Sequence, residues 1–388
     1  APTPPYEEVI RQLRSLAGSR PTSEAQIRLR DEARGALTST ARDFNGRLYY
    51  ERYGQFAAHY QNLGSVSSRA LDWSDAVRKY QTHNALQTAR AAGGRLDGLH
   101  LDSTSGMRRW GAVDDYDRRH WAAADLPLTF SYHSGLVTQR GIFPLYGHIA
   151  DVSDFVHRRR MILSANFNAD LRRTAGFFGA DRIDYFGIEQ GLQVRTKGGT
   201  VDQFAMWKRT LAYQRPITTL DARIGMGNLS LTEIDAQIQQ NLFYGIFAGA
   251  WDPEIEAEAT GDEPAWVRDD VATVWGRYTP IFRKLARSGW EPVTHARTSD
   301  RAVWVERFGE PDEPVMFTVR NETGVPRPVR LTIDVSALGP GPATRVSAIE
   351  EVTRRAVEVA LQAGGRRAAM ETTIPPRSTR VFTMTIGR

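Results

Sequence analysis

Alternating apolar and polar positions mark several short segments of this chain as strands. In residues 96–102, Leu99 and Leu101 alternate with Gly98, His100 and Asp102. Because successive side chains of a strand point to opposite faces, the leucines share one face and these three residues share the other. Similar apolar segments follow at 161–168, 182–191 and 242–249, and the first two carry polar residues near their ends. We expect these segments to be the buried strands of one sheet.

Helical spacing of apolar residues separates these strands. The clearest helix runs from Ser74 to Ala92, with an N-terminal capping residue at its start and two glycines after its end. Further helices are expected over residues 6–44, 152–160, 201–213, 232–241 and 266–287. Strands that alternate with helices predict βα units and a parallel sheet. The fold class expected for this half is therefore α/β, a (β/α)8 TIM-type barrel.

The pattern changes to strict alternation near residue 300. Four segments with period two, separated by Gly/Pro turns, lie at 303–308, 315–321, 328–334 and 379–386. Short alternating strands with such turns are typical of a small antiparallel β-sandwich. We divide the chain into a helical N-terminal segment (1–46), a (β/α) barrel catalytic domain (47–298) and a C-terminal β-sandwich (299–388).

The number of barrel strands is smaller than expected. A complete barrel needs eight strands, and six or seven are found here, including weaker segments at 47–53 and 126–132. Either the first strands are not recognisable from their pattern, or the chain is the C-terminal portion of a longer polypeptide. We favour the second interpretation, in which an N-terminal portion of the same polypeptide or another subunit completes the barrel.

Composition excludes several classes of protein. The 388 residues include no cysteine, which excludes disulfides, thiolate catalysis and cysteine-bound zinc. The formal net charge is +5, and the arginines alternate with acids except in residues 158–160, so that the basic stripe expected of a nucleic-acid-binding protein is missing. No apolar run is long enough for a membrane span.

Three predicted strands end in polar residues on the side expected to face the barrel interior: Asp102, Asn166 and Glu189. In this fold the carboxyl ends of the strands carry the chemistry. Two carboxylates at one such end are what glycoside hydrolysis requires, one as nucleophile or base and the other as acid. An amide or a histidine can bind sugar hydroxyls, and aromatic rings can stack on sugar rings. The expected substrate-binding residues are His100, Asn166, Tyr132, Trp110, Tyr146 and Trp251.

The segment Asp-Gly-Leu-His-Leu-Asp at 97–102 resembles a strand of retaining barrel glycosidases, whose last Asp is the nucleophile. Ile188-Glu189 resembles the acid of the α-galactosidase-like clan, although that clan commonly uses Asp there. The resemblance implies that Asp102 is the nucleophile and Glu189 the general acid/base. It also implies a carbohydrate substrate, no cofactor and no metal. We expect a secreted or cell-surface bacterial protein, with a cytoplasmic location still open.

Plainer interpretations remain open for these residues. Asp102 at a strand-to-helix turn is also typical of a helix cap. Glu189 could instead pair with Arg195 or Arg223, and His100 could be a hydrogen-bonded core histidine. The corresponding alternative function is a non-catalytic glycan-binding or surface-assembly protein on a degenerate glycosidase scaffold.

The acidic segment at residues 114–117 is expected to be a solvated loop, with a lid or a calcium site as alternatives. His133 and His148 could join His100 and Asp102 at a metal, but the spacing that would support such a site is absent.

Overall fold

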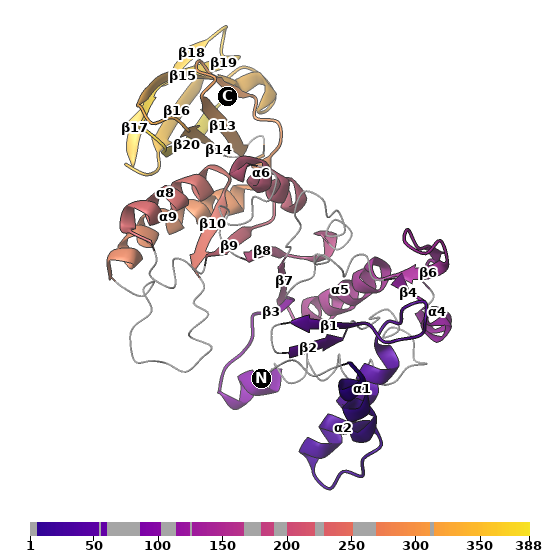
Figure 1. Ribbon diagram of the computed structural model, residues 1–388. Coiled ribbons are helices and arrows are strands. Elements are labelled where there is room, and N and C mark those ends of the chain that lie inside the picture. Colours follow the sequence, from indigo (N-terminus) through magenta and orange to yellow (C-terminus); the bar gives the residue numbers. More distant parts are fainter. Residues whose placement is uncertain are drawn as a thin grey trace. The chain divides into compact units, whose positions relative to one another are not determined.

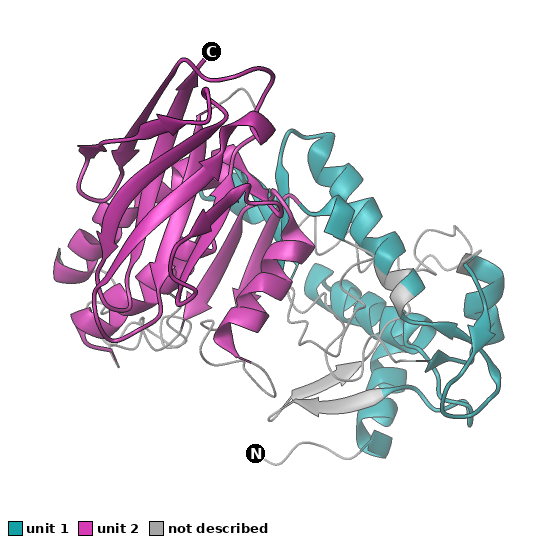
Figure 2. Ribbon diagram, turned by 90° about the horizontal axis from the view of Figure 1, so that it is seen from above, with its two compact units in different colours: residues 1–183 teal, residues 184–388 magenta. Residues whose placement is uncertain are grey.

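The computed structural model divides the chain into two compact units, Ala1–Ile183 and Asp184–Arg388, which Figure 2 shows in different colours. The structure describes residues 6–53, 56–59, 86–101, 114–124, 126–166, 180–189, 200–221, 229–250, 269–310 and 314–388. None of the helices among these residues is long and apolar enough to cross a membrane.

The first unit contains helices and short strands (Figure 1). In chain order its elements are α1 (Tyr6–Ala17), α2 (Glu24–Ser39), β1 (Tyr50–Tyr53), β2 (Phe56–His59), β3 (Gly98–Leu101), β4 (Asp114–Asp115), α4 (Arg118–Ala124), β5 (Thr129–Phe130), β6 (Val137–Arg140), α5 (Ile142–His157) and β7 (Ile162–Asn166). Ser23 caps α2 by accepting a hydrogen bond from the backbone N–H of Gln26.

The parallel pair β3–β7 is the part of the first unit that corresponds to the expected barrel. Leu163 and Ala165 of β7 are fully buried and lie next to the buried face of α5, which carries Val152 and Val156. Gly98 pairs with Ile162, and a Cβ at residue 98 would lie 2.5 Å from the carbonyl oxygen of Ile162. Position 98 therefore requires glycine for the close approach of the two strands.

Two weaker strand predictions of this half have a different structure from the one expected. Within residues 47–53, β1 forms an antiparallel hairpin with β2. Within residues 126–132, β5 pairs antiparallel with β6, which also pairs with β4. Short connections between consecutive strands permit antiparallel pairing, whereas parallel pairing needs a long crossover. Neither segment is therefore a strand of the parallel sheet.

The second unit begins with three parallel strands and their helices. They are β8 (Tyr185–Glu189), α6 (Val201–Ala212), β9 (Ile217–Asp221), α8 (Leu231–Phe243), β10 (Ile246–Ala250) and α9 (Asp269–Ser288). Each strand pairs with the next one along the chain, in the order β8–β9–β10. The helices between them begin at capping boxes, in which Thr200 and Gln203 bond reciprocally on α6 and Ser230 and Glu233 do so on α8.

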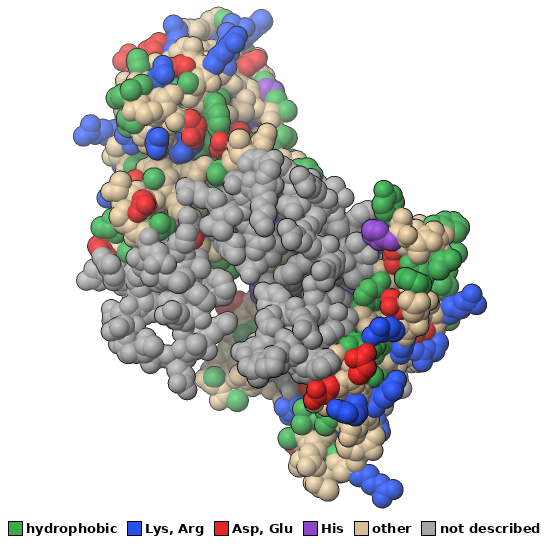
Figure 3. Space-filling model, viewed as in Figure 1, with side chains coloured by type: hydrophobic (Ala, Val, Ile, Leu, Met, Phe, Trp, Pro, Cys, Tyr) green, Lys and Arg blue, Asp and Glu red, His purple; other side chains and the backbone are tan. Residues whose placement is uncertain are grey.

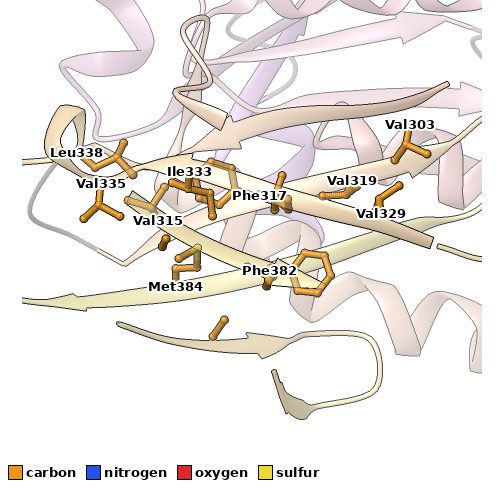
Figure 4. Packing of buried hydrophobic residues seen from close by; sticks show 14 of the residues in the cluster. Val303, Val315, Phe317, Val319, Val329, Ile333, Val335, Leu338, Phe382 and Met384 are labelled. Carbon is orange, nitrogen blue, oxygen red and sulfur yellow. The ribbon is translucent and has the colours of Figure 1, made fainter. Parts of the chain in front are cut away.

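A β-sandwich of two antiparallel sheets completes the second unit. One sheet has the order β11–β13–β14–β20–β16–β17 and the other β12–β15–β19–β18. The strands are β11 (Trp290–Glu291), β12 (Ala296–Thr298), β13 (Val303–Phe308), β14 (Val315–Asn321), β15 (Arg327–Asp334), β16 (Arg345–Glu350), β17 (Arg355–Val357), β18 (Ala360–Gln362), β19 (Arg367–Ile374) and β20 (Thr379–Gly387), with a short 3-10 helix η6 (Val335–Ala337) after β15. Buried apolar residues from both sheets form the core in Figure 4.

Helices α8 and α9 join the sandwich to the parallel strands of the second unit. Thr318 of β14 donates a 2.6 Å hydrogen bond to the carbonyl of Phe243, and Thr379 of β20 bonds to Gln239 through both its N–H and its hydroxyl. The buried guanidinium of Arg209 donates to three backbone carbonyls, including that of Gly245. Burial lowers the pKa of Arg209 to about 9, although the negative charge of Glu306 opposes this decrease. The hydrogen bonds of Thr318 and Thr379 thus fix the sandwich on α8, and Arg209 connects α6 to Gly245, which lies after α8.

The predicted α/β class with a C-terminal antiparallel β-sandwich is confirmed. The described residues contain five parallel strands of the barrel type, namely β3, β7, β8, β9 and β10. The proposed boundaries at residues 46 and 298 stay predictions, although the first strand of the sandwich begins at Trp290.

We predict that Phe317→Ala lowers the free energy of unfolding by about 3–5 kcal/mol, because it leaves a cavity in the sandwich core. Phe317 is fully buried and pairs directly with Phe382 across β14 and β20. The matched control is Ile349→Ala at a residue that is 48% exposed, for which we expect a change within about 0.5 kcal/mol. Urea denaturation of both variants measures the difference. Equal effects would contradict the assignment of the core.

Candidate functional site

His100 and Asn166 lie on the same face of adjacent strands. His100 pairs with Ser164 in the register of β3 and β7, and its Nδ1 lies 2.8 Å from the Ser164 hydroxyl. That hydroxyl donates its one proton to the carbonyl of Leu99. We therefore assign the proton of the His100–Ser164 hydrogen bond to Nδ1 of His100. The ring is exposed, which argues against a core histidine.

Asn166 is the last residue of β7, and its side chain is buried. It alternates with Ser164, so it belongs to the face that carries His100. Leu101, the last residue of β3, pairs with Ala165. Asp102 itself lies outside the described residues, as do Trp110 and Trp251.

Glu189 is the last residue of β8 in the second unit, where its backbone pairs with Leu220. Phe186 and Ile188 are almost completely buried, as expected for the face that packs on helices. Alternation places position 189 on the other face, which it shares with Tyr185.

Tyr185 and Thr218 form a hydrogen-bonded pair on that second face. Burial raises the pKa of Tyr185, and the hydrogen bond to Thr218 opposes this rise. Thr218 pairs with Gly187 in the register, and its hydroxyl also approaches the carbonyl of Phe247 at 3.3 Å. The face that carries position 189 is thus polar and ordered below the strand ends.

Asp221, which we did not predict as a site residue, is the last residue of β9 and only 2% exposed. The sequence does carry a signal for this residue, because a carboxylate follows the short extended segment 215–220 as Asp102 follows Leu101. Alternation places Asp221 on the face of Thr219, whose hydroxyl accepts a hydrogen bond from Asn241 of α8. It is a strand-end carboxylate on the side of the helices.

The two remaining aromatic candidates do not lie on the parallel strands. Tyr132 lies in the turn between β5 and β6 and is 86% exposed. Tyr146 lies in α5 and forms a hydrogen bond with Arg182. Of the predicted site residues that the structure describes, it brings together His100 and Asn166.

The acidic segment at 114–117 is not the solvated loop that we expected. Asp114, Asp115 and Asp117 are all buried, and His120 of α4 is completely inaccessible to solvent. His120 lies between two acceptors, with Nδ1 2.5 Å from Asp115 and Nε2 2.6 Å from the carbonyl oxygen of Thr38. The expectation was wrong because the partners of these acids come from distant parts of the chain.

The contacts of His120 fix its protonation. A backbone carbonyl can only accept, so Nε2 carries a proton, and Asp115 accepts the second one from Nδ1. Burial by itself lowers the pKa of His120, but the hydrogen bonds and the charges of Asp115 and Asp117 raise it above its usual value. Burial by itself raises the pKa of Asp117, but hydrogen bonds donated by Arg119 hold this pKa well below its usual range.

This cluster of charges is structural. Asp115 also accepts hydrogen bonds from the backbone N–H groups of Arg42 and Asp117, and its carbonyl accepts one from Trp121. The cluster therefore ties the end of α2 to β4 and α4. No group of three or more acidic or histidine side chains in the described ranges is placed to hold a metal ion.

Comparison with known proteins finds matches among solved structures alone. No family model matches the chain, and no curated protein matches its sequence. The structure is similar to a GH27 β-L-arabinopyranosidase from Geobacillus stearothermophilus (8% identity, TM-score 0.42), with 76% of this chain and 59% of that one covered. It is also similar to a GH30 endoxylanase from Clostridium papyrosolvens C71 (10% identity, TM-score 0.40, 88% and 76% covered).

α-Galactosidase I from Mortierella vinacea is a further similar structure, with 9% identity, a TM-score of 0.40 and 63% of this chain and 64% of that one covered. These three solved structures are glycoside hydrolases. The chain spans less than two thirds of the length of the arabinopyranosidase.

We predict that the free energy of unfolding decreases as the pH rises above 6.5, the ordinary pKa of histidine. The pKa of His120 is 6.5 when unfolded and higher when folded, so its stabilisation is complete below 6.5 and disappears as the pH rises through the folded pKa. Between the two pKa values the free energy of unfolding falls by about 1.4 kcal/mol per pH unit. Urea denaturation over a pH series measures this slope.

The variant His120→Gln should remove that slope, whereas His133→Gln, at an exposed histidine, should retain it. An unchanged slope in His120→Gln would contradict the assignment of a buried, protonated histidine.

Proposed function

We propose that this protein is a glycoside hydrolase that cleaves a glycosidic bond of a poly- or oligosaccharide or a glycoconjugate. Asp102 is the nucleophile and Glu189 the general acid/base, and the mechanism is retaining. The observation that supports the proposal most is the face of β3 and β7 that presents His100 and Asn166 at the carboxyl end of parallel strands. Asp102 directly follows β3 on the sequence.

The substrate contacts follow from the chemistry of each group. Asn166 offers an amide donor and acceptor, which suit a sugar hydroxyl. His100 donates through Nδ1 to Ser164, and this hydrogen bond fixes the orientation of the ring. Two carboxylates in a retaining site lie about 5–5.5 Å apart, so that one attacks the anomeric carbon while the other protonates the leaving group.

The barrel of this enzyme also needs further strands. In the described residues, β3 pairs with β7 on one side only. We propose that strands from elsewhere in the polypeptide, or from another subunit, pair with the other edge of β3 and complete the barrel. An edge strand of this kind is a template for such pairing.

The decisive variants are Asp102→Asn and Glu189→Gln, tested on a panel of aryl glycosides. Loss of a catalytic acid or base lowers kcat by about 10²–10⁴-fold. In Glu189→Gln the loss of kcat/KM should be much smaller for glycosides with a dinitrophenol leaving group, because that group departs without protonation, whereas kcat stays low because hydrolysis of the glycosyl-enzyme still needs the general base. In Asp102→Asn the loss should be the same for all leaving groups.

Asp97→Asn is the matched control. Asp97 lies just before the same strand, but its side chain is 85% exposed and pairs with Arg95. We expect less than about a twofold change in kcat, since an exposed pair contributes little. Full activity in Asp102→Asn would contradict the proposed mechanism, and binding of polysaccharide without hydrolysis would favour the non-catalytic alternative.

A further inference from the structure

The hairpin formed by β5 and β6 exposes a continuous group of apolar side chains. In Figure 3, hydrophobic side chains and a histidine gather where Figure 1 labels β4 and β6. The large hydrophobic residues exposed on this hairpin are Leu128 (47%), Phe130 (69%), Tyr132 (86%), Leu136 (52%) and Val137 (42%). Single exposed apolar residues are ordinary, but a contiguous group of this kind marks an interaction site.

A set of hydrogen bonds fixes the turn of this hairpin. Its turn is closed by the pair Ser131 N–H to Leu136 carbonyl (2.8 Å) and Gly135 N–H to Ser131 carbonyl (3.0 Å). The Ser131 hydroxyl accepts hydrogen bonds from the backbone N–H groups of the next turn residues, His133 and Ser134. These hydrogen bonds hold the backbone of the turn that carries the exposed apolar side chains.

A buried acid, Asp114, forms a hydrogen bond with the turn of the hairpin. The Ser131 hydroxyl donates a 2.5 Å hydrogen bond to Asp114, which is only 3% exposed. Tyr116 and Ser134 form a second link of 2.7 Å between β4 and the turn. The cluster around His120 is thus connected through β4 to the turn of the hairpin.

The exposed charged side chains of the described residues 114–140 are positive. Within residues 114–140, the described acids Asp114, Asp115 and Asp117 are buried, whereas Arg118 is exposed and the side chain of Arg119 is 64% exposed. A guanidinium has five N–H donors, so an arginine that pairs with a buried carboxylate can still bind a phosphate. Within residues 114–140 an anionic partner would meet arginines and no exposed described carboxylate.

We propose that the β5–β6 hairpin binds the surface of an anionic lipid bilayer. Its apolar tip enters the boundary between headgroups and acyl chains, and Arg118 and Arg119 contact lipid phosphates. Aromatic and aliphatic residues beside cations are the composition of interfacial membrane contacts. This inference does not depend on the proposed function.

The composition of the tip favours lipid over a glycan. Sugar-binding surfaces combine aromatic rings with carboxylates and amides that bind hydroxyls. Here the neighbouring carboxylates are buried and bonded within the protein, and Leu128, Leu136 and Val137 offer no hydrogen bond. Tyr132 and His133, with rings packed edge to face, place polar atoms next to an apolar body at the end of the hairpin.

The test is flotation of the full chain with vesicles of phosphatidylcholine, with or without about 30% phosphatidylglycerol. We expect binding to the anionic vesicles that weakens as salt rises. Phe130→Ser/Leu136→Ser should lower the partition coefficient at least about tenfold, because it removes the apolar contact. Arg118→Gln should lower it several-fold and reduce its dependence on salt.

The matched control is Val293→Ser/Val325→Ser, which removes two equally exposed apolar side chains from the sandwich and should leave vesicle binding unchanged. Far-UV circular dichroism and urea denaturation check that every variant folds. Absence of binding to anionic vesicles would overturn the proposal, as would equal binding by the hairpin variant. Hairpin-dependent dimerisation or polysaccharide binding, without vesicle binding, would also overturn it.

Discussion

The hydrogen-bonded register of parallel strands decides which side chains of this protein can meet. His100 lies opposite Ser164 because β3 and β7 pair residue for residue, and alternation then places Asn166 on the same face. In the second unit the pairing of β8 with β9 places Glu189 beside Leu220 at the end of both strands. A shift of one residue would turn each polar group toward the helices. The buried residues Leu163, Ala165 and Ile188 oppose that shift.

A second constraint is the burial of charge. Removing one partner from a buried ion pair costs about 3–5 kcal/mol, so such pairs hold their surroundings in one arrangement. His120 and Asp115 do this between α2, β4 and α4, and Asp114 continues the network to the turn of the hairpin. In the second unit the buried guanidinium of Arg209 donates hydrogen bonds to backbone carbonyls at the ends of α6 and α8.

The buried parallel strands could be predicted from the sequence because their signal is local. The segment 96–102 contains β3, 161–168 contains β7, and 182–191 contains β8. The acid cluster could not be predicted in this way. Asp115 binds the N–H of Arg42, 73 residues earlier, and no local pattern shows that such a partner exists. The antiparallel pairing of β5 was missed for a similar reason, since an apolar run does not reveal its neighbour.

We propose that Asp102, which follows β3 in the sequence, is the nucleophile of a retaining glycosidase. The most direct measurement is labelling with activated 2-deoxy-2-fluoro glycosides, followed by mass spectrometry of the intact chain and its peptides. A retaining enzyme accumulates a covalent glycosyl intermediate on its nucleophile. The account predicts one label per chain, on the peptide that contains Asp102, and none in Asp102→Asn. A label on another carboxylate, or turnover of the same sugars without any covalent intermediate, would contradict it.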